Sequence, residues 1–162
     1  MIGIKRILLL ICLAACFASC KKNQIEEFDH VAQFQKDTAA INAFVKANNI
    51  TGGTMHPEYG IYYKVITPGT GSVSYKGATK ITANYEGRLL DGTVFDSTNG
   101  TPRTFTLDYV IAGWYFGIPM IQKGGEMRLI IPSYYAYGNR KNGPVPGNSV
   151  LDFDITITDL VP

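Results

Sequence analysis

Near its C-terminus the chain reads LDFDITIT over residues 151–158, a strict alternation of apolar and polar side chains. Because successive side chains of a β-strand point to opposite faces of a sheet, this period of two predicts a strand that is buried on one face. The buried face would carry Leu151, Phe153, Ile155 and Ile157. This segment therefore indicates a fold built on a β-sheet with an apolar face.

Two segments nearer the N-terminus show the same period. Residues 80–86 read KITANYE, and residues 126–131 read EMRLII, in which Ile130 is an apolar residue on the otherwise polar face. Shorter strand candidates lie at residues 61–66 and 104–107. Turn sequences between these strands are Pro68-Gly69, Asp91-Gly92, Asn99-Gly100 and Lys123-Gly124-Gly125.

One short helix is expected between two of the strands. Trp114, Ile118 and Ile121 fall at helical spacing, and Pro119 limits the length of the helix. We therefore expect an α+β fold in which an antiparallel sheet curls around a short helix that covers one sheet face.

A further helical segment precedes the sheet. Apolar residues recur there at spacings of three and four, at Phe28, Val31, Phe34, Ile41, Phe44 and Val45. The pattern fits one helix, or two helices if Asp37 caps the second. Such a segment could pack on its own domain or space it from a membrane, and the alternative is an arm for dimerisation or partner docking.

The first twenty residues have the character of an export signal. Lys5 and Arg6 precede the apolar run at residues 7–15, which is too short to span a membrane. Cys16 and Cys20 each follow small residues in a pattern that resembles the lipobox of bacterial lipoproteins. This resemblance implies cleavage before the cysteine, acylation of its thiol, and anchoring of an exported protein to the bacterial cell envelope, on its periplasmic face or at the cell surface.

The choice between the two cysteines rests on their neighbours. Cys16 has the better-matching box, but Cys20 directly precedes the polar stretch 21–24, so Cys20 is preferred and Cys16 is the alternative. Ordinary signal cleavage after Ala18 or Ser19 is a third interpretation.

The expected organisation has five parts. They are a lipoprotein signal peptide at residues 1–19, a tether at 20–26, a helical extension at 27–50, a linker at 51–57 and the main domain at 58–162.

Charge and composition argue against several functional classes. Without Lys5 and Arg6, 13 of the 15 basic residues remain against 13 acidic ones, so no electrostatic footprint for nucleic acid is expected. All three cysteines lie in the first twenty residues, and the two histidines, His30 and His56, are far apart in sequence. We therefore expect no disulfide framework, no metal site and no cofactor. No motif for a catalytic nucleophile or a phosphate-binding loop is present.

Aromatic residues are concentrated at strand ends and around the short helix. They are Tyr85, Phe95, Trp114, Tyr137 and Phe153. If they line one concavity, it would be a deep apolar pocket with a few polar atoms, suited to a small apolar ligand or side chain. The alternative is that they simply form the core.

Five motifs, in order, connect these residues. They read ANYEG at residues 83–87, DGTVFDST at 91–98, VIAGW at 110–114, IIPSYYAYG at 130–138 and LDFDI at 151–155. Together they resemble the FK506-binding protein (FKBP) family of peptidyl-prolyl cis/trans isomerases over about residues 58–160. The resemblance implies a five-stranded antiparallel half β-barrel wrapped around a short α-helix, with the helical segment as an N-terminal extension.

The resemblance also assigns a pocket, residue by residue. It implies catalytic roles for Tyr85, Phe95, Asp96 and Tyr137, and substrate-binding roles for Val110, Ile111, Trp114, Val145 and Phe153. The Tyr137 hydroxyl would bind a substrate carbonyl, and Asp96 would be oriented by the Tyr85 hydroxyl. The implied function is non-covalent isomerisation of proline-containing polypeptides during the folding of exported proteins, with FK506-type macrolides as further ligands.

Three departures from the family pattern bear on this pocket. Arg103 stands where an aromatic residue is usual, the stretch 107–110 is about two residues short, and Lys141 replaces a common histidine. Arg103 predicts a pocket wall that is open or charged, unless Tyr109 or the Tyr115-Phe116 pair fills it. The main alternative function is a non-catalytic chaperone or peptide-binding module of the same fold, and a structural envelope protein is a weaker one.

Overall fold

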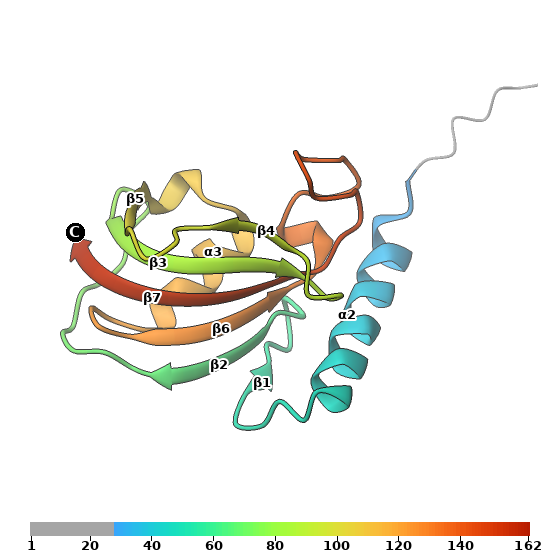
Figure 1. The fold of residues 1–162 in the computed structure, drawn as a ribbon, viewed down its shortest axis with the longest axis horizontal. Helices are drawn as coiled ribbons and strands as arrows, with labels where there is room; N and C mark the ends of the chain where they lie inside the picture. Colours follow the sequence, from blue (N-terminus) through green and yellow to red (C-terminus); the bar gives the residue numbers. More distant parts are fainter. Residues whose placement is uncertain (1–27) are drawn as a thin grey trace, which may run out of the picture.

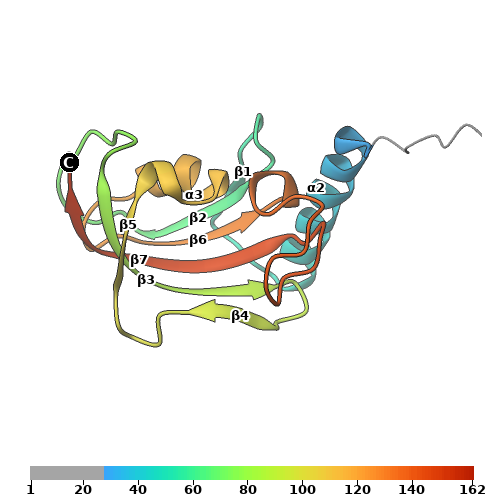
Figure 2. The same ribbon diagram turned by 90° about the horizontal axis from the view of Figure 1, so that it is seen from above.

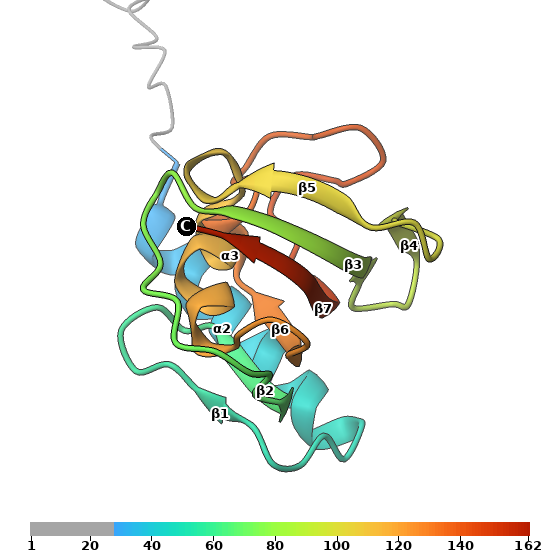
Figure 3. The same cartoon turned by 90° about the vertical axis from the view of Figure 1, so that its left-hand side faces the viewer.

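The computed structural model describes residues 28–162 (Figure 1). In this part of the chain, an antiparallel sheet curves around a short helix, α3 (Ala112–Gly117), as Figure 3 shows. A longer helix, α2 (His30–Ala47), lies beside one end of the sheet (Figure 2). The predicted α+β class, with its antiparallel sheet, short helix and N-terminal helix, is confirmed.

Membrane attachment was predicted for residues outside the described range. The proposed signal peptide, the tether and the candidate lipidation sites Cys16 and Cys20 all lie there. Neither α2 nor any other helix within residues 28–162 combines the length and the apolar character needed to span a bilayer.

The sheet has seven strands in the order β1-β2-β6-β7-β3-β4, and β5 also pairs with β3. The strands are β1 (Thr54–Met55), β2 (Tyr62–Thr67), β3 (Lys80–Leu89), β4 (Val94–Ser97), β5 (Arg103–Thr106), β6 (Glu126–Ile131) and β7 (Leu151–Val161). All pairs are antiparallel. There are two strands more than the five expected, because β1 forms in the predicted linker and two short strands, β4 and β5, share the outer edge of β3.

The period of two correctly identified the inner face of the sheet. In β7, Leu151, Phe153, Ile155 and Ile157 are all buried, and β3 and β6 contribute further buried side chains to the same core. Each fully buried aliphatic side chain of this kind stabilises the fold by about 1.5–3 kcal/mol. The central ladder β3-β7-β6 therefore holds the core together.

Helix α3 packs tightly on β6 through two glycines. A Cβ atom added at Gly113 would overlap Ile131, and one added at Gly117 would overlap Leu129. These glycines are one helical turn apart, so the same face of α3 rests on the sheet. A 3₁₀-helix, η3 (Ile118–Met120), containing Pro119, continues the chain after α3.

The N-terminal extension contains a single helix. The Asp29 side chain caps α2 by accepting a 2.9 Å hydrogen bond from the Ala32 N–H. The prediction that Asp37 caps a second helix is wrong, because Asp37 lies inside α2 and its carboxylate binds Ser133 of the main domain instead.

Helix α2 packs on its own domain, on the outer side of the sheet. Ile41 is fully buried there, in a small cluster with Tyr62, Ile130 and Val150. This contact explains why the polar face of the predicted strand at residues 126–131 carries an isoleucine. The cluster is separate from the main core on the inner face.

Next to this cluster, a charged network crosses three strands. Asp152 is 2% exposed and accepts hydrogen bonds from Arg128 Nε at 2.8 Å and Arg128 Nη2 at 2.7 Å. Arg88 Nη2 lies 3.3 Å from Asp152 and 2.6 Å from Asp154. The Arg128 guanidinium also lies 5.8 Å from the centre of the Phe44 ring of α2. The buried carboxylate thus joins β3, β6 and β7 beneath the helix.

We expect Asp152→Ala to lower the free energy of unfolding by about 1.5–3 kcal/mol, the usual worth of a hydrogen bond to a charged group, because two partly buried arginines would lose a shared partner. Urea denaturation followed by circular dichroism measures this change. Asp159→Ala is the matched control, since it removes an exposed ion pair, 2.6 Å long, with Lys123 and should leave the midpoint near that of the wild type. Equal destabilisation by both variants would contradict the special role of Asp152.

Candidate functional site

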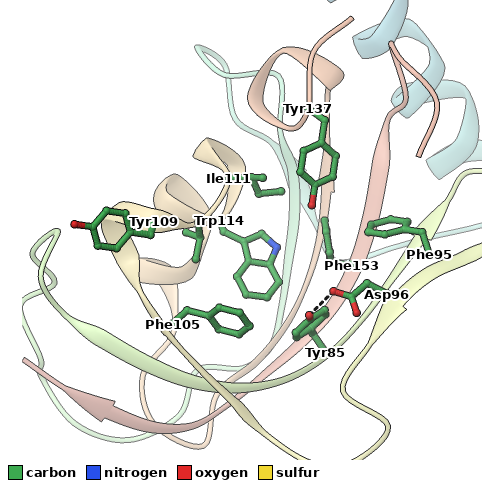
Figure 4. Close-up of a pocket in the computed structure, with 10 residues that line it drawn as sticks. Tyr85, Phe95, Asp96, Phe105, Tyr109, Ile111, Trp114, Tyr137 and Phe153 are labelled. Carbon is green, nitrogen blue, oxygen red and sulfur yellow. Dashed lines mark hydrogen bonds between the residues drawn. The ribbon is translucent and has the colours of Figure 1, made fainter. Parts of the chain in front are cut away.

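A cavity of about 230 Å³ opens between α3, the β3–β5 region and the turn that follows β6 (Figure 4). It is lined by Tyr85, Phe95, Asp96, Phe105, Tyr109, Val110, Ile111, Trp114, Tyr137 and Phe153. Most of the lining is aromatic or aliphatic, with Asp96 as its one acidic side chain. A cavity of this size suits one ring-bearing side chain rather than a large ligand enclosed on all sides.

Eight of the nine predicted site residues meet at this cavity. The exception is Val145, which does not line it: Val145 is 2% exposed, packs in the main core, and exchanges two 2.9 Å backbone hydrogen bonds with Asn142. The aromatic residues at the strand ends therefore do more than fill the core.

Two lining residues are not among the nine predicted site residues, although Tyr109 was named as a residue that could fill the open wall. Phe105 lies in β5 opposite Ile81 of β3, and its place in the candidate strand 104–107 could have identified it as an inward-facing residue. Tyr109 lies at the rim, 88% exposed, and Figure 4 shows its hydroxyl directed away from the cavity. Tyr109 therefore does not fill the wall.

Trp114 forms the floor of the cavity. It is 4% exposed and stands on the first turn of α3. Its ring meets those of Tyr85, Phe105 and Phe153 edge to face, with centroid distances of 5.1, 5.8 and 5.4 Å. Such pairs each add about 0.5–1.5 kcal/mol beyond their buried area, so the floor is a rigid aromatic surface.

Tyr85 and Asp96 form the main polar pair of the site. The Tyr85 hydroxyl donates a 2.5 Å hydrogen bond to Asp96 Oδ2 (Figure 4). Burial, followed by this bond and the charge of Asp96, raises the pKa of Tyr85 to about 12, although Arg103 opposes the shift. The phenol therefore remains protonated, and keeps orienting the carboxylate, at any physiological pH.

Arg103 braces this pair from outside the cavity. Its Nη1 lies 3.1 Å from the Tyr85 hydroxyl and 3.2 Å from Asp96 Oδ1, and its Nη2 donates to the Ser97 carbonyl at 3.0 Å. Arg103 is not among the lining residues, and its side chain is half exposed. Phe105, two residues further along β5, is the residue of this strand that faces the cavity.

Hydrogen-bond donors lie among the residues that line the cavity, including the buried Trp114 Nε1–H, which has no acceptor within residues 28–162. The Tyr137 hydroxyl is directed into the cavity in Figure 4, and burial followed by the charge of Asp96 raises the pKa of Tyr137, which keeps this group protonated. Ile111 precedes α3, and its backbone N–H donates to no acceptor within residues 28–162. A neutral carbonyl-bearing chain with an apolar ring is the kind of ligand that these groups fit.

Metal binding has no candidate site in the described chain. Within residues 28–162, no three His, Cys, Asp or Glu side chains cluster closely enough to hold an ion. His30 and His56 instead contact aromatic rings, those of Phe28 and Tyr59 respectively.

Comparison with known proteins identifies this architecture. The sequence profile of the FKBP-type peptidyl-prolyl cis-trans isomerase family matches residues 71–158. A probable FKBP-type peptidyl-prolyl cis-trans isomerase FkpA from Neisseria meningitidis is 38% identical over 134 residues, which is 81% of this chain and 49% of the relative. The outer membrane protein MIP of Legionella longbeachae is 39% identical over 132 residues, 80% of this chain and 55% of that protein.

The fold comparison agrees. The crystal structure of FkpA from Escherichia coli superposes with a TM-score of 0.68 at 30% identity, covering 99% of this chain and 84% of that one. By sequence, the chain spans about half the length of the two curated relatives cited above. The sequence match to full-length FkpA from Escherichia coli covers 38% of that protein. The matched motifs, the sheet wrapped around α3 and the aromatic cavity show that the chain belongs to the FKBP-type peptidyl-prolyl cis-trans isomerase family.

Proposed function

We propose that this protein is a peptidyl-prolyl cis/trans isomerase that assists the folding of exported proteins. The observation that carries the proposal is an aromatic cavity that is floored by Trp114 and lined by Ile111, with the Tyr137 hydroxyl directed into it. Eight residues assigned by family resemblance line this one cavity. No cofactor is needed for this reaction.

The chemistry requires no covalent step. The two isomers of an Xaa-Pro bond are separated by a barrier of about 20 kcal/mol, so uncatalysed exchange takes tens of seconds or more. Twisting the amide breaks its resonance and reduces the polarity of the C–N unit. A dry aromatic pocket therefore favours the twisted state over the planar state more than water does, and each 1.4 kcal/mol of this preference is about tenfold in rate.

Each group has a distinct role in this scheme. The proline ring would lie on Trp114, between the walls made by Phe95 and Phe153. The Tyr137 hydroxyl and the Ile111 N–H would hold the carbonyls of the peptide. The Tyr85 hydroxyl holds the Asp96 carboxylate in a fixed orientation at the mouth of the cavity. There the carboxylate would interact electrostatically with the twisting amide, without transferring a proton.

The alternative of a non-catalytic peptide-binding module rested on Arg103. Because Arg103 lies outside the lining and braces the Tyr85–Asp96 pair, it leaves the cavity apolar. This geometry favours the isomerase over the binding module. The same apolar cavity supports binding of FK506-type macrolides, one part of which would occupy the place of the proline ring.

We expect Tyr137→Phe to lower kcat/KM about tenfold for a short peptide with an apolar residue before proline, because a peptide carbonyl loses its donor. Exchange measured by NMR line shape or a protease-coupled assay tests this. Excess FK506 should suppress the wild-type acceleration. Tyr115→Phe removes a hydroxyl from a residue of α3 that does not line the cavity, and it should leave kcat/KM unchanged. A folded wild-type protein that accelerates nothing would instead support the binding module.

The reaction rate should be independent of pH between about 6 and 9. The pKa values of Tyr85 and Tyr137 are raised above the ordinary tyrosine value of about 10, so both hydroxyls remain donors throughout this range. The rate should fall only in more alkaline solution, where the phenols lose their protons. A bell-shaped profile centred near neutrality would contradict a mechanism without proton transfer.

Attachment to the envelope is part of the proposal. The lipobox-like sequences at Cys20 and Cys16 support acylation, and a relative is named as an outer membrane protein. We place the folded domain on the periplasmic face or at the cell surface, tethered by its lipid. An oligomer formed through the N-terminal extension is a weaker prediction, because α2 buries its Asp37–Ile41 face against its own domain.

We expect Cys20→Ala to release the protein from the membrane fraction of the expressing bacterium, and Cys16→Ala to leave it there. Fractionation followed by immunoblotting measures the distribution, and metabolic labelling with palmitate reports acylation directly. The opposite pattern would assign the lipid to Cys16, and unlabelled protein in every case would indicate ordinary signal cleavage.

A further inference from the structure

Asp37 is a buried carboxylate that the proposed mechanism does not use. It is 3% exposed, within α2, and no basic side chain within residues 28–162 pairs with it. Its Oδ2 accepts the Ser133 N–H at 2.8 Å and the Ser133 hydroxyl at 2.6 Å, and its Oδ1 accepts from Gln33 Nε2 at 2.7 Å. A buried carboxylate held by three donors fixes its partners closely.

Ser133 in turn organises the turn that carries Tyr137. It begins the 3₁₀-helix η4 (Ser133–Tyr135) and is itself 2% exposed. Its carbonyl accepts the Ala136 N–H at 3.0 Å and the Gly138 N–H at 2.8 Å. These two amides lie directly before and after Tyr137, so a single serine fixes the backbone on both sides of the cavity's phenol.

A continuous chain of hydrogen bonds therefore leads from α2 to the cavity. It passes from the Asp37 carboxylate through both donors of Ser133, and then from the Ser133 carbonyl to the residues that flank Tyr137. Helix α2 lies wholly outside residues 71–158, the segment that the family profile matches. The N-terminal extension thus adds a support for the pocket that the matched segment does not contain.

We propose that Asp37 is a positioning residue for Tyr137, through which α2 sets the orientation of the Tyr137 hydroxyl toward the bound peptide. The inference rests on the proposed isomerase function for its kinetic consequence, but its structural part can be tested separately. Without the carboxylate, the buried Ser133 N–H and hydroxyl would lack an acceptor, and η4 would shift to find one. Small displacements of a positioning group reduce rate strongly.

A double-mutant cycle on the full chain tests the kinetic part. Asp37→Ala should lower kcat/KM about tenfold, and should lower it no further when Tyr137 is already phenylalanine, because Asp37 acts through that hydroxyl. Asp37→Asn should retain near wild-type kcat/KM. The amide oxygen of the introduced asparagine can accept both Ser133 donors, and its NH₂ group can donate to the Gln33 side-chain oxygen once the Gln33 amide has turned over. The same fold loss in both Tyr137 backgrounds would overturn the proposal.

Ile41→Ala separates positioning from general loss of packing. Ile41 lies on the same helix, fully buried against the outer face of the sheet. Its truncation should lower the melting temperature, while kcat/KM measured well below that temperature stays at the wild-type value. If Ile41→Ala also lowered kcat/KM, and lowered it no further in the Tyr137→Phe background, the effect would belong to helix docking as a whole. That result would overturn the specific role of Asp37.

Amide hydrogen exchange tests the structural part without any activity. In Asp37→Ala, the amides of Ala136 and Gly138 should exchange at least severalfold faster, while that of Thr98, bonded to the Tyr85 carbonyl, should not change. Unchanged exchange at Ala136 and Gly138 would overturn the inference even if the protein is an active isomerase. Faster exchange in a protein without isomerase activity would refute the proposed function while leaving the support of the turn established.

Discussion

The close packing of α3 on β6 is the contact on which the cavity depends. Gly113 and Gly117 bring the helix backbone against Ile131 and Leu129, with no room for a side chain between them. This packing holds Trp114 in the position where its ring makes edge-to-face contacts with three other aromatic rings. Because Trp114 stands between these two glycines, the close packing fixes the position of its ring at the floor of the cavity.

Much of the fold could be predicted because most outward-facing residues of the strands are polar, although α2 covers the outer face around Ile130. Period two in residues 80–86, 126–131 and 151–158 gave strands whose inward residues are those of the core. The number of strands was less accessible, since β1 consists of two residues in a segment with no periodic pattern. Ile130, out of phase with its strand, was the one local sign that the outer face is covered.

The candidate site was predictable from motifs, but its connections were not. Family resemblance placed eight residues at one cavity, whereas the position of Val145 in the core depends on a turn whose geometry no local pattern encodes. Asp37 was named as the cap of a second helix in one of two interpretations, because aspartate commonly occupies that position. Its true partner, Ser133, is 96 residues away, and contacts at that separation leave no signature in a single sequence.

The packing of α2 has a consequence for what counts as the folding unit. Tyr62, Ile130 and Val150 belong to the family-like domain, yet Ile41 of the extension completes their burial. A protein beginning at residue 58 would present these apolar side chains to water as a contiguous patch, the kind of surface that drives self-association. The extension therefore covers an apolar part of the sheet's outer face, although it lies outside the segment that the family profile matches.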